Sequence, residues 1–200
     1  MKKILFLLLV FLSSKSFSQK SNEYLNYIDE LKKETKIDKS DKTVYDLLNN
    51  FYEENLQSHT GEMKPETISK IQAFYSDIKS KNKHIFNMFF AYQNHITETA
   101  AVGKKSNSKF QVDLISDLEE EIKKVYGNVP VIILIYKAEA LNSNGQYQEY
   151  TELINKSLNI FPNSIPLKVY RYLDSKDEKL KEDLIKNHSN HWMVKQFQIK

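Results

Sequence analysis

Glycine and proline are scarce in this sequence, with four of each among its 200 residues. Average usage is about 12% for the two together, roughly three times as much. Sheet-rich proteins need a turn about every 8–12 residues, and turns draw on glycine, proline, asparagine and aspartate. The shortage therefore predicts long helices with short connections, and an all-α fold.

The rest of the composition narrows the class of protein further. The chain has no cysteine, so it has no disulfide, thiolate metal site, cysteine nucleophile or lipidated cysteine of a bacterial lipoprotein. Charged residues make up 28% and aromatic residues 12% of the sequence. These values are typical of a globular chain and argue against disorder or a protein embedded as a whole in a membrane.

The first 18 residues have the pattern of a secretory signal peptide. Lys2 and Lys3 precede nine apolar residues, 4–12, and small and polar residues follow up to Ser18. Nine helical residues rise only about 13.5 Å, whereas a bilayer's hydrocarbon core is about 30 Å thick. We predict cleavage before Gln19 and export to the bacterial periplasm or beyond the cell, with the periplasm favoured and no stable membrane anchor afterwards. An uncleaved amphipathic anchor is the alternative.

Removing this segment changes the charge of the chain. Lys2, Lys3 and Lys15 are its only charged residues, so the remaining residues carry 26 basic and 26 acidic side chains. Phosphate recognition relies on clustered lysine and arginine. Here Arg171 is the single arginine and the lysines alternate with acids. We therefore expect no nucleic-acid partner.

Helical periodicity extends over residues 19–200, which we predict to form one all-α domain. We expect N-terminal helices over 21–81, beginning after Ser21, after Ser40 or Asp41, and at Pro65, and a fourth helix over about 84–100. A polar break over 103–108 precedes a fifth helix. The positions expected to face the core are Tyr24, Ile28, Leu31, Val44, Leu47, Leu48, Phe51, Ile68, Ile71, Tyr75, Ile78, Ile85, Phe86, Phe89, Phe90, Ile96, Phe110, Leu114, Leu118, Ile122 and Val125.

The segment 129–136 is apolar throughout and would suit a buried strand or a buried helix. The sequence contains no second strand-like run for it to pair with, and an isolated strand would leave its backbone groups unpaired. We therefore predict a buried helix that begins at Pro130.

Glu119 and Glu120 each have a lysine four residues later, a spacing that is typical of a solvated helix face. Neighbouring helical carboxylates such as Glu119, Glu120 and Glu121 diverge by about 100° and do not form a pair for acid–base chemistry. We therefore expect this face of the fifth helix to be exposed.

A short sequence pattern recurs in the C-terminal half of the chain. The sequence VYGN at 125–128 is echoed 35 residues later by IFPN at 160–163, and 186–190 forms a weaker third copy. A period near 34 with two helices per unit is typical of helical solenoids. The segment from about 131 to 164 resembles a tetratricopeptide repeat, through a small residue, an inter-helix turn, two apolar positions and a closing proline: Ala138, Gly145, Tyr147, Ile154, Leu158 and Pro162. Leu134, Lys137, Tyr150 and Ser157 depart from the pattern.

This resemblance implies antiparallel helix pairs over about 85–200, stacked as a short α-solenoid; a closed helical bundle is the alternative. It also implies a non-catalytic scaffold or adaptor that binds a protein or peptide in a groove. Carried over by position, Ile135, Glu139 and Asn142 would face the groove, and Tyr170 and Asp174 would do so in the next unit. The oligomeric state stays open.

The sequence contains no catalytic motif that would favour an enzyme over this binding scaffold. The sequence has no H-E-x-x-H, G-x-S-x-G, P-loop or dinucleotide motif, and we expect no cofactor and no metal. His188 and His191 have a metal-ligand spacing, but Ser189 and Asn190 between them indicate a helix boundary that separates the two rings. A small metal-dependent hydrolase using these histidines and a nearby carboxylate, or a structural envelope subunit, are the alternative functions.

Overall fold

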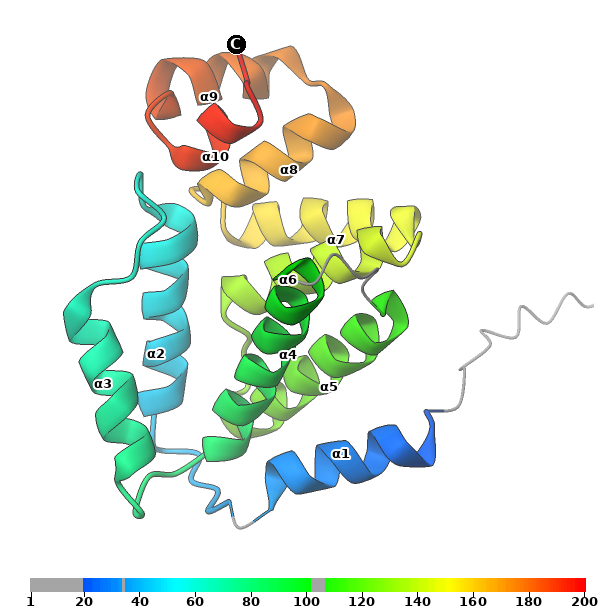
Figure 1. The fold of residues 1–200 in the computed structure, drawn as a ribbon. Coiled ribbons are helices and arrows are strands. Elements are labelled where there is room, and N and C mark those ends of the chain that lie inside the picture. The colour runs from blue at the N-terminus through cyan, green and yellow to red at the C-terminus, as the bar shows by residue number, and fades with distance from the viewer. Residues whose placement is uncertain (1–19, 34, 102–106) are drawn as a thin grey trace, which may run out of the picture.

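The computed structural model describes residues 20–33, 35–101 and 107–200. The expected signal peptide, 1–18, and most of the expected break over 103–108 lie outside these residues. The described residues form ten α-helices and one short π-helix and contain no strand, which confirms the all-α fold (Figure 1). The elements are α1 (Asn22–Lys32), α2 (Thr43–Phe51), η1 (Tyr52–Gln57), α3 (Pro65–Ser76), α4 (Lys83–Ala101), α5 (Ser108–Tyr126), α6 (Val131–Ser143), α7 (Tyr147–Ile160), α8 (Ile165–Ser175), α9 (Glu178–His188) and α10 (Trp192–Gln196).

Several helices begin at the residues that the sequence indicated. The Ser21 side chain caps α1 by accepting a hydrogen bond from the backbone N–H of Tyr24, and Pro65 occupies the first turn of α3. Most of the apolar segment 129–136 lies in α6, which begins at Val131 directly after Pro130. The start of α2 differs slightly, because Lys42 is its N-terminal flanking residue and Asp41 accepts a hydrogen bond from the backbone of Thr43.

Helices α4 to α9 pack in chain order, each against the next. Short connections between consecutive helices favour antiparallel neighbours, and only Asn144, Gly145 and Gln146 separate α6 from α7. Helix α1 packs against α4 and is held to α5 by ion pairs from Lys20 and Lys32. The C-terminal helices α8, α9 and α10 gather at the end opposite α1 (Figure 1).

The aromatic residues of α4 form the centre of the core, as the periodicity predicted. Phe86, Phe89 and Tyr92 are almost completely buried. The ring of Phe51 on α2 meets Phe86 and Phe89 edge to face, with centroids 6.1 and 5.0 Å apart. Helix α2 is therefore attached to α4 by aromatic packing, which is a large source of buried apolar area.

The segment after α2 reaches across the array. Element η1 contacts both α6 and α8. The side-chain amide of Gln57 donates to the carbonyl of Asn163 at 3.0 Å, and its oxygen accepts from the backbone N–H of Ile165, also at 3.0 Å. One side chain thus satisfies backbone groups just before and at the start of α8.

The buried face of α3 differs from our prediction. Ile68 and Tyr75 are exposed, and Ile78, just after the helix, is 84% exposed. Thr67 and Phe74 are buried instead. The hydroxyl of Thr67 donates to the carboxylate of Glu54 at 2.8 Å, so the buried side of α3 includes a polar contact that the apolar pattern does not indicate.

The prediction that Glu119 lies on a solvated face is also wrong. Glu119 is buried, and its two carboxylate oxygens contact Lys123 on the same helix and Lys137 on α6. Glu120 is exposed, as expected. Because the Glu119 carboxylate forms ion pairs with lysines on α5 and α6, it links these two helices and is not a surface charge.

The helices in the described part of the chain include none with the length and apolarity needed to cross a membrane.

Two positions in α6 and the turn after it have the environments that a small residue and a turn glycine would need. Ala138 is completely buried, and Gly145 has a φ of +76°, in the left-handed region that favours glycine.

Candidate functional site

Glu139 and Tyr170, which the sequence placed separately on two units, meet in the structure. Glu139 lies near the C-terminal end of α6 and Tyr170 in the middle of α8. The phenol of Tyr170 donates a short hydrogen bond to the Glu139 carboxylate. Both side chains are partly buried, so the pair joins the two helices while keeping some access to solvent.

Four tyrosines surround this carboxylate, and together they form what we call the Glu139 cluster: Tyr92, Tyr136, Glu139, Tyr150 and Tyr170. The rings of Tyr92 and Tyr136 stack with centroids 5.7 Å apart, and the Tyr92 phenol donates to the backbone carbonyl of Tyr136 at 2.9 Å. Tyr150 on α7 places its phenol 3.5 Å from the carbonyl of Tyr170. The cluster therefore draws on α4, α6, α7 and α8.

The electrostatics of the cluster follow from burial. Burial raises the pKa of Glu139, although the hydrogen bond from Tyr170 opposes this by favouring the charged form. Burial also raises the pKa of all four phenols, that of Tyr150 to about 12, and the charge of Glu139 contributes to each of these shifts. The tyrosines therefore remain neutral hydrogen-bond groups at physiological pH.

The other sequence-predicted residues have different environments. Ile135 is completely buried in the core and offers no surface to a partner. Asn142 is exposed at the end of α6. Asp174 is exposed on α8, where it accepts a hydrogen bond from Thr151 at 3.0 Å and lies 3.7 Å from the guanidinium of Arg171. The structure thus brings Glu139 and Tyr170 together in one contact and leaves Asn142 and Asp174 at the surface.

Sequence reasoning missed Tyr92, Tyr136 and Tyr150. A signal for Tyr136 was present, since it precedes Glu139 by three residues and so shares its side of α6. Tyr150 was noted only as a departure from the repeat pattern. Their convergence on one carboxylate depends on the packing of four helices.

His188 is the last residue of α9 and His191 is the N-cap of α10, so a helix boundary lies between them. The Nε2 atom of His191 lies 2.9 Å from the carbonyl of Leu56, and its Nδ1 accepts from the backbone N–H of Met193. His188 instead lies 4.0 Å from Asp183. In the described ranges, no group of three or more histidine, aspartate or glutamate side chains has an arrangement that could hold a metal ion.

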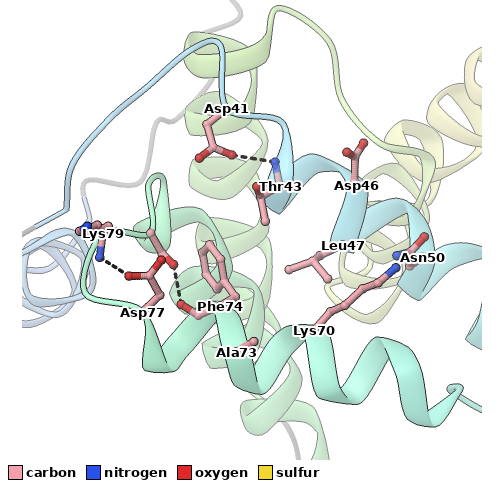
Figure 2. A pocket seen from close by; sticks show the side chains of 11 residues that line it. Asp41, Thr43, Asp46, Leu47, Asn50, Lys70, Ala73, Phe74, Asp77 and Lys79 are labelled. Atoms are coloured by element: carbon pink, nitrogen blue, oxygen red, sulfur yellow. Dashed lines mark hydrogen bonds between the residues drawn. The ribbon is translucent and has the colours of Figure 1, made fainter.

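A hollow of about 530 Å³ lies between α2 and α3 (Figure 2). Three of the polar side chains that line it are engaged in local turns. Asp41 accepts from the backbone of Thr43, Asp77 from that of Lys79, and Ser80 donates to the carbonyl of Phe74. These contacts cap helix ends and stabilise the loop after α3, so we regard this hollow as structural.

Comparison of the sequence with protein-family models and with curated proteins, and of the fold with solved structures, found no match. The class of this protein therefore rests on its own architecture, an array of α-helices with a tyrosine-lined carboxylate between α6 and α8.

Proposed function

We propose that this protein is a non-catalytic scaffold that binds a protein or peptide segment across α6 and α8, and that Glu139 receives a basic side chain of that segment. The observation that carries the proposal is the Glu139 cluster. A partly buried carboxylate with a raised pKa is typical of functional sites. The functional groups of the cluster are one carboxylate and four phenols, and these groups suit the binding of a partner better than the cleavage of a bond.

The composition of the cluster also matches what binding surfaces use. Tyrosine is enriched among the residues that dominate interface energies, because it combines a large apolar ring with a polar tip. A lysine or arginine near Glu139 would gain an ion pair and contact with aromatic faces. Asp174 at the surface of α8 adds a second acidic group, which accepts a hydrogen bond from Thr151 of α7.

The proposal is tested with an array of extended peptides that differ only in one central residue, which is Lys, Arg, Gln or Glu. We expect peptides with Lys or Arg to bind and those with Glu to bind at least tenfold more weakly, a difference of about 1.4 kcal/mol. Glu139→Gln should remove this preference. Equal binding of the Lys and Glu peptides to the unaltered protein would exclude the proposed role of Glu139.

Conservative variants are needed at this site. Tyr170 also packs against the core, so truncation to alanine would confuse loss of binding with loss of structure. Tyr170→Phe removes only the hydroxyl that meets Glu139. Glu120→Gln, at an exposed position on α5, is the matched control and should leave peptide affinity unchanged.

The proposal extends to the repeat class and the location of the protein. Helices that pack in chain order, with a small buried residue at Ala138 and a glycine turn at Gly145, support a tetratricopeptide-like array. The pattern of residues 1–18 supports export. Amino-terminal sequencing of the protein from a bacterial envelope fraction should start at Gln19, and a species that retains residues 1–18 would contradict cleavage.

A further inference from the structure

A cavity of about 390 Å³ opens where α5, α6 and α7 meet, away from the Glu139 cluster. Its volume lies within the range of roughly 300–1,000 Å³ that is typical of small-molecule sites. Leu134, Leu153 and Phe161 supply apolar walls. These side chains are only partly buried, so the cavity exposes apolar surface that a ligand would cover.

One polar side chain that lines this cavity has no hydrogen-bond partner among the described residues. Ser157 lines the cavity and is 1% exposed, yet its hydroxyl makes no hydrogen bond with any described residue. A buried hydroxyl without a partner costs about 1–3 kcal/mol, so such groups are rare in folded proteins. A ligand atom that pairs with this hydroxyl would recover that cost.

The charge around the cavity is positive. Lys123 and Lys156 line it, and the single acidic side chain, Glu119, is already shared between Lys123 and Lys137. Lys156 is exposed and has no acidic partner in the part of the chain that the structure describes. Like Ser157 it lines the cavity, and its flexible four-carbon stem can bring the ammonium to an anion bound there.

We propose that this cavity binds an amphiphilic aliphatic carboxylate. The carboxylate accepts hydrogen bonds from the Ser157 hydroxyl and the Lys156 ammonium, and the hydrocarbon tail covers Leu134, Leu153 and Phe161. Uncompensated positive charge, one buried hydroxyl and apolar walls are the three features that this class of ligand matches together. None of the residues that line the cavity belongs to the Glu139 cluster, so this proposal does not depend on the proposed peptide binding.

The test is calorimetric titration of the whole folded protein with octanoate, decanoate and dodecanoate below their micellar concentrations. We expect one saturable site and about fourfold tighter binding for each methylene added, which corresponds to about 0.8 kcal/mol. Decanol should bind at least tenfold more weakly than decanoate. No saturable binding, or equal affinity for decanol and decanoate, would overturn the proposal.

Variants assign the binding to this cavity. Lys156→Met and Ser157→Ala should each weaken decanoate binding several-fold, and Leu134→Trp should abolish it by filling the space. Lys179→Met, at an exposed position on α9, is the control and should bind decanoate normally. Ser157→Ala without ligand should melt no lower than the unaltered protein, because it removes an unsatisfied hydroxyl. Unchanged affinity in both Lys156→Met and Ser157→Ala would refute the site.

Discussion

The ammonium of Lys137 on α6 lies 2.6 Å from the carboxylate of Glu119 on α5. Lys137 stands where the repeat pattern expects an apolar residue, and Glu119 stands where a helix-surface charge was expected. Each departure accounts for the other, since the two side chains pair across the contact between their helices. The second oxygen of Glu119 serves Lys123, so both oxygens of the carboxylate have a cationic partner.

Glu119→Gln should lower the free energy of unfolding by about 1–3 kcal/mol, because it weakens two charge-assisted hydrogen bonds at a buried position. Glu120→Gln, one residue away but exposed, should change it by less than about 0.5 kcal/mol. Urea denaturation measures both. Burial acts to raise the pKa of Glu119, but hydrogen bonds from the two lysines outweigh it, so the pKa is lowered. The stability that ionised Glu119 contributes is therefore present above the unfolded pKa and is lost as the pH falls through the folded pKa. Equal effects of the two variants would contradict this role.

Ala138→Leu should destabilise the protein by about 1–3 kcal/mol. Ala138 is completely buried on α6, and the added atoms have to displace packed neighbours. Ala73→Leu is a matched control, because Ala73 is also helical but lies exposed on α3. It should change the melting temperature little, and a comparable loss in both variants would show that burial at Ala138 does not matter.

Gly145→Val should cost about 1–2 kcal/mol for conformational reasons alone. A Cβ atom at Gly145 would meet no atom within 4 Å, so no clash contributes. The penalty comes from the φ of +76°, which β-branched residues strongly disfavour. Gly145→Asn should cost clearly less, since asparagine tolerates this region. Chemical denaturation of the two variants compares them directly, and similar losses would point to a cause other than the backbone.

Protonation of His191 should destabilise the protein in mild acid. Burial lowers the pKa of His191, and the nearby His59 and His188 add to this, although the Leu56 carbonyl opposes it. A lowered folded pKa means that the stabilisation is present above the unfolded value of about 6.5 and is lost as the pH falls through the folded pKa. Protonation also converts Nδ1 from an acceptor into a donor that faces the backbone N–H of Met193.

His191→Asn keeps an oxygen to cap α10 but does not titrate. Its free energy of unfolding should therefore depend less on pH between 7.5 and 5 than that of the unaltered protein, although its stability at neutral pH should be lower. His59→Gln, at an exposed position, serves as the comparison and should retain most of the pH dependence. Identical pH profiles for His191→Asn and the unaltered protein would rule out His191 as the titrating group.

The sequence predicts most of the helices because their local signals agree. Capping at Ser21, proline at position 65 and the spacing of Val44, Leu47, Leu48 and Phe51 each indicate the structure that forms. The face of α3 was not predictable in this way. Apolarity favoured Ile68, whereas the buried residue is Thr67, whose partner Glu54 belongs to another element.

The candidate site was predictable only in part. Position within a repeat selected Glu139 and Tyr170 as separate groove residues, but it gave no sign that they bond to each other. The repeat positions also selected Ile135, which is completely buried in the core. Periodicity describes one helix at a time, whereas a site depends on how several helices are rotated and spaced against one another.

The position of η1 has a consequence for how the molecule unfolds. In a simple solenoid each unit contacts only its neighbours, so an end unit can detach while the others remain folded. Here Gln57 bonds at the start of α8 and Leu56 meets His191, which are 108 and 135 residues away along the chain. Closing such long loops costs conformational entropy before the contacts form. These contacts connect the C-terminal helices to the segment around residue 57, so we expect the two regions to unfold together rather than from one end.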